Sequence, residues 1–361
     1  MSYKKSLHEL VNKVPKSLVD MELAPKKKNP PTQASSEFIT NREQGDWAEA
    51  VLMAAINGLG RDIVAVRYGK GDRLVAGQPG FEDFYRAYQH ELATIGKRPD
   101  LLLFRTKDYD YDWGYDISEM PLDEAAKVVP KAIAAFEVRS SAFLVEEYEE
   151  DLKRRVTVLR ARADELLSTL LGSHAKAFKP DVLACLKTLS AADLSEFPPR
   201  VQLLRGADGN AARELWDELK DVRRKLTETR DYLSFTPKAE DLASVWHWVQ
   251  KYDVPHFYVQ VFFDRVYGIG LSHILSLLAT PDNESKRFFV EKDVKNQEKT
   301  TLKINVKDGH EVAGRLAMPS HQSKMLKLPR GRLLFYVAFE GGQAYLNVGN
   351  LYSLIGFTPT P

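Results

Sequence analysis

The 361-residue chain has a single cysteine, Cys185, and no apolar run near the roughly 20 residues that a membrane-spanning helix needs. One cysteine excludes an internal disulfide framework and a cysteine-rich zinc site, so we expect a protein of a reducing compartment. The first ten residues are polar and basic, without the apolar centre of a secretory signal. These absences favour a cytoplasmic protein that does not contact a membrane.

Neither positive nor negative charge is in clear excess in the sequence. The chain has 51 Lys or Arg and 50 Asp or Glu, and its net charge of +1 gives no overall field that indicates a nucleic-acid partner. The charge is unevenly distributed, however: residues 286–340 carry twelve Lys or Arg against six acids. Such segregation permits a basic face on the folded protein, and the alternative is ordinary solvated surface charge.

The pattern along the first 140 residues predicts a helix followed by three strands. Residues 1–38 lack sustained hydrophobic periodicity and indicate a basic N-terminal arm. A helix is expected from about Asn41 to Asn57, with Thr40 and Glu43 forming a capping box at its start. The three apolar strands are expected at residues 62–68, 100–104 and 132–138.

The rest of the chain predicts further helices and then strands, which makes the fold class α+β. Two apolar stripes at helical spacing, within about residues 146–234, predict a pair of long helices packed on each other. A helix over 239–252 and one long strand starting at His256 follow. Residues 286–361 predict a β-rich region separate from the first sheet, with a hairpin turn at Asp308-Gly309.

Two of the predicted strands each carry one carboxylate near an end. Asp100 begins the second strand and Glu137 lies near the end of the third, so antiparallel pairing can bring them together. Mg²⁺ prefers oxygen ligands, and phosphodiester hydrolysis needs an ion that polarises the phosphate and lowers the pKa of a water molecule. The alternative is that Asp100 caps a turn and Glu137 only pairs with Arg139.

The residues Pro99-Asp100 and Glu137-x-Arg139, preceded by a helix that bears Glu49, resemble the motif of the PD-(D/E)XK nuclease superfamily. Four stretches resemble the AccI-type restriction endonucleases: SEFITNREQGDWAE, KRPDLLLF, FEVRSSAFL and VPHFYVQVFFDRVYGI. The resemblance implies a restriction-endonuclease-like αβββαβ catalytic core over residues 39–285. A helical insertion at about 146–234 interrupts this core, and residues 286–361 follow it as a possible DNA-recognition element.

The resemblance also implies a function: a type II restriction endonuclease of a prokaryotic cytoplasm, acting as a homodimer on double-stranded DNA with Mg²⁺. Asp100 and Glu137 would be the metal ligands and Glu49 an accessory acidic ligand, with Asp46, one turn earlier, as the competing choice. Two other functions stay open. One is a repair or structure-specific nuclease with the same core, and the other is a non-catalytic, sequence-specific DNA-binding protein.

Arg139 departs from the superfamily motif, which has a lysine at this position. An arginine does not readily deprotonate and is unfit as a general base, but it can hold the scissile phosphate or stabilise transition-state charge. We therefore expect Arg139 to fill the lysine position, with Lys97 as the alternative. Ser140 and Ser141 follow as candidate contacts to phosphate or water, although the polarity common at strand ends explains them almost as well.

The stretch MPSHQSKMLKLPRGR, residues 318–332, concentrates hydroxyl, amide and cationic side chains in a segment expected to be a loop. Base edges are read by such groups, while Lys and Arg on phosphates fix the register. Gln322, Lys324 and Arg330 are the candidate DNA contacts here, and an ordinary surface loop is the alternative.

Overall fold

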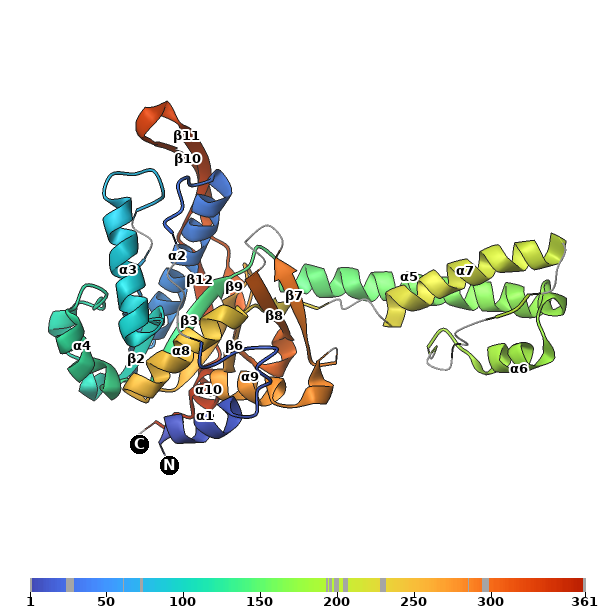
Figure 1. Ribbon diagram of the computed structural model, residues 1–361, viewed down its shortest axis with the longest axis horizontal. Helices are drawn as coiled ribbons and strands as arrows, with labels where there is room; N and C mark the ends of the chain where they lie inside the picture. Colours follow the sequence, from blue (N-terminus) through green and yellow to red (C-terminus); the bar gives the residue numbers. More distant parts are fainter. Residues whose placement is uncertain are drawn as a thin grey trace. The chain divides into compact units, whose positions relative to one another are not determined.

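The structure is a computed structural model that describes residues 2–23, 29–60, 62–71, 74–192, 194, 197, 201–203, 207–227, 232–284, 286–293 and 299–359 (Figure 1). The fold is α+β, as predicted. The chain divides into two compact units, Met1–Val145 with Leu233–Pro361, and Glu146–Tyr232. Within the described ranges, no helix is long and apolar enough to cross a membrane.

The first unit is built on a seven-stranded sheet with the order β1-β2-β3-β5-β6-β9-β12. Neighbouring strands are antiparallel except β3 and β5, which are parallel. A parallel pair needs a long crossover, and here the crossover contains the whole second unit. The strands are β1 Ile63–Arg67, β2 Leu101–Arg105, β3 Ala134–Ser140, β5 His256–Val261, β6 Val266–Gly270, β9 His310–Ala317 and β12 Gln343–Leu346.

Helices cover both faces of this sheet. On one face, α2 (Ser36–Asn57) and α10 (Val348–Ile355) share an apolar core with alternate residues of the strands, Phe136 and Val138 among them. On the other face, α8 (Ala239–Tyr252) packs Trp248 against His256 of β5. Because side chains alternate along a strand, the neighbours of Phe136 and Val138 in β3, including Glu137, point to the α8 face.

Smaller elements complete the first unit. They are α1 Tyr3–Val11, α3 Phe81–Ile95, α4 Leu122–Val128 and α9 Leu271–Leu278, a three-stranded sheet of β4 Ser234–Phe235, β8 Lys299–Asn305 and β7 Phe288–Asp293, and the hairpin of β10 Ser320–Lys327 with β11 Leu333–Glu340. Part of the expected N-terminal arm is thus a helix: α1 packs on α9, and its Leu7 is fully buried.

The predicted capping box at the start of α2 is wrong. The helix begins at Ser36, and the Ser35 hydroxyl accepts the hydrogen bond from the Phe38 amide, so the cap lies five residues earlier than expected. Thr40 is therefore inside the helix, where its hydroxyl accepts a hydrogen bond from the amide of Val337 in β11. Glu43 pairs with Arg42 instead of capping.

Three expectations for the second half of the chain are also corrected. The long strand from His256 is a hairpin, β5 and β6, closed where the Phe262 amide donates to the Arg265 carbonyl. The C-terminal strands are not separate from the first sheet, because β9 and β12 extend it. Asp308-Gly309 does not close a hairpin, since β8 before it and β9 after it belong to different sheets.

The second unit is helical, with α5 Val145–Gly172, α6 Pro180–Thr188 and α7 Ala207–Thr227. Apolar residues of α5 and α7, such as Leu166 and Leu219, lie in one buried cluster. Arg162 of α5 also pairs with Glu218 of α7 at 2.7 Å. The apolar stripes seen in the sequence are therefore the faces on which these two helices pack.

Gly96, in the loop before β2, lies directly against α8. A substitution at this residue therefore tests how the loop and the helix pack. Its φ is +79°, and a Cβ there would collide with the Ser244 carbonyl oxygen and lie 2.7 Å from the Trp248 amide. We expect Gly96→Ala to lower the free energy of unfolding by about 1–3 kcal/mol through backbone strain alone, with the collision adding to this.

The matched control for this prediction is Gly45→Ala, inside α2, where a Cβ meets nothing within 4 Å. Alanine is the better helix former, so Gly45→Ala should raise the unfolding free energy by up to about 1 kcal/mol. Chemical denaturation of the three proteins measures both changes. Equal stability of wild type and Gly96→Ala would contradict the close approach of the loop to α8.

Candidate active site

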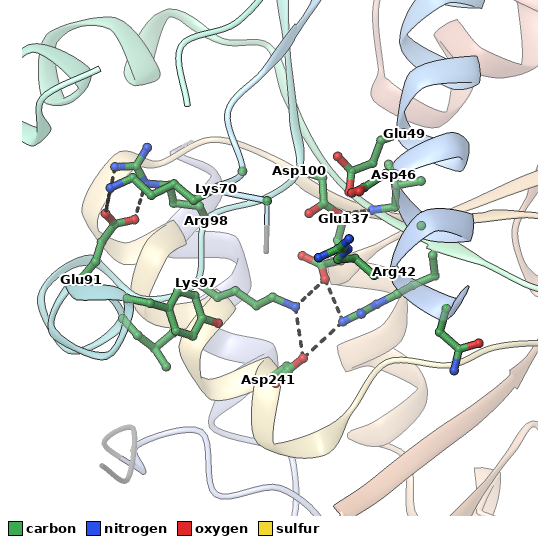
Figure 2. A pocket seen from close by; sticks show the side chains of 18 of the residues that line it. Arg42, Asp46, Glu49, Lys70, Glu91, Lys97, Arg98, Asp100, Glu137 and Asp241 are labelled. Carbon is green, nitrogen blue, oxygen red and sulfur yellow. Dashed lines mark hydrogen bonds and ion pairs between the residues drawn. The ribbon is translucent and has the colours of Figure 1, made fainter. Parts of the chain in front are cut away.

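A cleft of about 590 Å³ lies where the ends of β2 and β3 meet α2, α3 and the start of α8 (Figure 2). Its lining combines acids and bases from segments far apart in the sequence. The charged residues among them are Arg42, Asp46, Glu49, Lys70, Glu91, Lys97, Arg98, Asp100, Glu137, Arg139, Lys238 and Asp241. The structure thus brings the predicted Glu49, Asp100, Glu137 and Arg139 into one cavity.

The backbone fixes Asp100 beside β3. Its amide donates to the Phe136 carbonyl at 2.9 Å, and its Oδ2 accepts a hydrogen bond from the Val138 amide at 2.7 Å. These two bonds bracket Glu137, so both carboxylates are presented at the same end of the sheet. The register between β2 and β3 therefore sets the distance between the two acids, as the antiparallel pairing predicted.

Glu137 is at the centre of an ion-pair network (Figure 2). Its Oε1 accepts from Lys97 Nζ at 2.5 Å and pairs with Arg139 Nη2 at 2.8 Å. The same two cations also contact Oδ2 of Asp241, at 3.1 Å for Lys97 and 3.2 Å for Arg139. Lys97 and Arg139 thus occupy equivalent places, each bridging Glu137 and Asp241.

These contacts hold the network in its charged form. Burial alone would raise the pKa of Glu137, but Lys97 and Arg139 outweigh it and lower the pKa. Burial and Arg139 act to lower the pKa of Lys97, yet Asp241 and Glu137 raise it above the ordinary lysine value. The pKa of Asp241 is lowered because Lys97 and Arg139 outweigh the effect of its burial. Lys97 is therefore a cation in this arrangement and not a free base.

Glu49 and Asp100, which also line the cleft, have raised pKa values. Burial raises the pKa of Glu49 to about 7, and the charge of Asp46 adds to this, although Arg67 pairs with Glu49 at 3.2 Å. The pKa of Asp100 is raised well above its usual range by burial and by the charges of Glu137 and Glu49. Figure 2 shows Glu49 and Asp46 on the same helix, near Asp100. Both acids therefore hold their protons more tightly than usual, and a bound cation would lower their pKa and stabilise the ionised forms.

The donor set fits a magnesium ion through two carboxylates. In the described part of the chain, no group of three or more His, Cys, Asp or Glu side chains is arranged to hold a metal ion. Mg²⁺, however, is usually held by one or two carboxylates and completes its shell with water and substrate phosphate. Oε2 of Glu137 is buried without a hydrogen-bond partner among the described residues, so an acceptor oxygen is available beside Asp100.

The predicted DNA contacts lie in two places. Ser140, at the end of β3, lines the cleft, and Ser141 follows it with its amide bonded to the Val261 carbonyl. The other three are outside the cleft. Gln322 and Lys324 are exposed on β10, and Arg330 is exposed at the tip of the β10–β11 hairpin, so this segment is a hairpin and not the expected loop.

Asp241 was missed by the sequence analysis. It lies in the first turn of α8, more than a hundred residues after Glu137, and acids in a first helical turn are ordinary because they favour the helix dipole. An acid at the start of an amphipathic helix, four residues after Pro237, gave no sequence signal of a functional site. Only the packing of α8 against the loop at Gly96 brings it to Lys97.

Comparison with known proteins gives one family. The family described as AccI restriction endonuclease matches residues 1–360, almost the whole chain. No curated protein and no solved structure matches the chain.

The raised pKa of Glu49 predicts a pH-dependent cost to stability. The folded protein holds this proton more tightly than the unfolded chain, because the pKa rises from its ordinary 4.5 to about 7. The contribution of Glu49 to stability therefore falls as the pH rises from about 4.5 to about 7. Glu49→Gln removes this cost, so its melting temperature relative to wild type should increase across that window.

Thermal melts in the presence of a chelator, at several pH values between 4 and 8, measure this difference. Glu37→Gln, which removes an exposed carboxylate from the first turn of α2, is the control for losing one acid from the same helix. A difference between Glu49→Gln and wild type that stays constant over the window would contradict the buried environment of Glu49.

Proposed function

Because the chain belongs to the AccI restriction endonuclease family, we propose that it is a type II restriction endonuclease of the PD-(D/E)XK kind. It would make Mg²⁺-dependent, site-specific double-strand cuts in DNA by phosphodiester hydrolysis. The observation that supports this most is the cleft in which Asp100 and Glu137 meet the two cations Lys97 and Arg139. Two neighbouring acids, one of which is contacted by two cations, suit a site that cleaves a phosphodiester.

Asp100 and Glu137 are the proposed metal ligands, with Glu49 as the accessory acid. Asp100 is fixed by the Val138 amide, and Glu137 offers its buried Oε2 while Oε1 binds the cations. A bound Mg²⁺ supplies the positive charge that polarises the phosphate and lowers the pKa of a water molecule. The pKa of Glu49 is raised to about 7, and its side chain is more exposed than that of Glu137. We therefore propose that Glu49 contributes to metal binding but is not essential for it.

Arg139 is proposed to fill the position of the superfamily lysine. It stays protonated, so it holds the scissile phosphate and stabilises the charge that develops on its oxygens. Lys97 reaches the same Glu137 oxygen from the loop before β2 and adds a second cation at this place. Ser140, which follows Arg139 and lines the cleft, is the proposed hydroxyl contact to phosphate, with Ser141 next to it.

The β10–β11 hairpin is proposed to contact DNA. A two-stranded ribbon fits the major groove, and six successive residues of β10, from Ser320 to Met325, are exposed. Residues 320–340 carry four cations and one acid, which suits a phosphate-lined groove. The middle of β11 is fixed to α2, the helix that bears Glu49, through the Thr40–Val337 bond of 3.1 Å. Gln322 is the proposed base contact, and Lys324 and Arg330 the phosphate contacts.

We also propose a homodimer in a prokaryotic cytoplasm. Each chain carries one Asp100–Glu137 pair, and we propose that each protomer cuts one strand. A two-fold symmetric DNA site is matched most simply by a two-fold dimer.

The carboxylates of Asp100 and Glu137 are expected to be essential for cleavage. Digestion of a long phage DNA with the wild-type protein and Mg²⁺ should give discrete bands, and sequencing of the cut ends should give one recognition site. Glu137→Gln and Asp100→Asn should each lower the cleavage rate by at least about 100-fold, because electrostatic stabilisation at the phosphate is lost. Gel-shift affinity for the same DNA without Mg²⁺ should be largely kept.

Asp112→Asn is the control for this experiment, since it changes an exposed acid that does not line the cleft. Smeared or nicked products from the wild type would favour a repair nuclease. Binding to DNA with no cleavage in Mg²⁺ or Mn²⁺ would favour a non-catalytic DNA-binding protein.

Another functional prediction concerns the hairpin. Lys324→Ala and Arg330→Ala should weaken binding to specific and random duplexes alike and lower the salt dependence by about one phosphate contact each. Gln322→Ala should cost about 1–3 kcal/mol on the specific duplex only. Lys251→Ala, at the exposed far end of α8, is the control for losing a surface cation. Unchanged affinities for both duplexes in all three hairpin variants would exclude the hairpin from the DNA interface.

A further inference from the structure

Asp241 closes a ring of four charged side chains in which signs alternate. Going round the ring, Lys97, Glu137, Arg139 and Asp241 each contact two neighbours of opposite charge. The side chain of Glu137 is 2% exposed, whereas those of Lys97, Arg139 and Asp241 are 18%, 30% and 32% exposed. The buried corner of the ring is therefore Glu137, and Asp241 lies at its opposite, cleft-facing corner.

The ring needs Asp241 for electrostatic balance. Lys97 and Arg139 both approach one oxygen of Glu137, and the charge of Arg139 acts to lower the pKa of Lys97, which is the sign of their mutual repulsion. Glu137 carries one charge against two cations, and Asp241 is a second carboxylate in contact with both of them. Without the second carboxylate, the cations would be expected to move apart, and the longer and more exposed of them would leave Glu137.

The helix that carries Asp241 also fixes the loop that carries Lys97. The Lys97 amide donates to the Ser244 carbonyl of α8 at 3.0 Å, and Gly96 packs against the same turn without room for a Cβ. The rest of α8 is anchored by buried residues such as Leu242 and Trp248. Asp241 thus stands on a rigid element whose position relative to Lys97 is set by the backbone, which is what a positioning group requires.

We propose that Asp241 is a positioning residue for cleavage: its carboxylate holds Lys97 and Arg139 side by side against Glu137 Oε1, so that both cations face the phosphate in the cleft. This inference rests on the proposed nuclease function and adds a residue to it. In this proposal Asp241 acts on neither phosphate nor metal directly. It acts through the two cations, and pre-organised charges stabilise a transition state without reorganising during the reaction.

A double-mutant cycle tests the proposal. Single-turnover cleavage rates at saturating enzyme and Mg²⁺ are measured for wild type, Asp241→Asn, Lys97→Ala and the double variant. Asp241→Asn should lower the rate by about 10- to 100-fold, the usual effect of losing an outer partner of a catalytic group. In the Lys97→Ala background the same substitution should cost less than about 3-fold, because Glu137 then faces Arg139 alone and there is no second cation whose repulsion Asp241 must offset.

Two further variants make the result specific. Asp241→Glu keeps the charge and should recover part of the rate, and it also serves if Asp241→Asn does not fold. Glu240→Gln removes the neighbouring acid of the same helical turn, whose Oε1 accepts from the Thr300 amide, and should cleave at the wild-type rate. DNA affinity measured without Mg²⁺ should change little in Asp241→Asn, which separates lost positioning from lost binding.

Two outcomes would overturn the proposal while leaving the nuclease function intact. One is wild-type cleavage by Asp241→Asn, and the other is an equal loss from this substitution with and without Lys97. A wild-type protein that cleaves no DNA would instead overturn the proposed function itself, and the wild-type arm of the experiment shows this directly.

Discussion

The structure of the site depends on one buried carboxylate, that of Glu137, whose two oxygens have different surroundings. Oε1 is bound by Lys97 and Arg139, while Oε2 is buried without a hydrogen-bond partner in the described part of the chain. A buried carboxylate is stable only when it is paired, so the cations make the ionised acid possible. Its second oxygen then remains an acceptor for a further positive charge. Asp100, held by the Val138 amide, places a second carboxylate beside it.

The scaffold explains how groups so distant in sequence meet. Antiparallel pairing of β2 and β3 sets Asp100 against Glu137, and the parallel pairing of β3 with β5 requires the chain to cross over between them. The crossover contains the helical unit and then α8, which returns to cover the sheet and delivers Asp241. The inserted unit has a buried core of its own.

The sequence predicted those features that local signals determine. The helix over 239–252 has its predicted bounds, and Asp100 directly precedes β2. Glu137, expected near the end of its strand, is the middle residue of β3. The predictions that were wrong concern features that depend on residues distant in the sequence. Ser35 caps α2 in place of Thr40, whose hydroxyl is used by β11, and the polar β10 becomes a strand only because β11 pairs with it. Asp241 could not be found, because nothing in its neighbourhood differs from an ordinary first helical turn.

Oε1 of Glu137 contacts two cations, and under the proposed function Oε2 and Asp100 would hold the divalent ion. The most direct measurement is anomalous diffraction from crystals of the protein with bound DNA and Mn²⁺. We expect an anomalous peak between Asp100 and Oε2 of Glu137, with Lys97 and Arg139 still on Oε1. A Mn²⁺ peak elsewhere, or none in this cleft while DNA occupies it, would exclude Asp100 and Glu137 as the metal ligands.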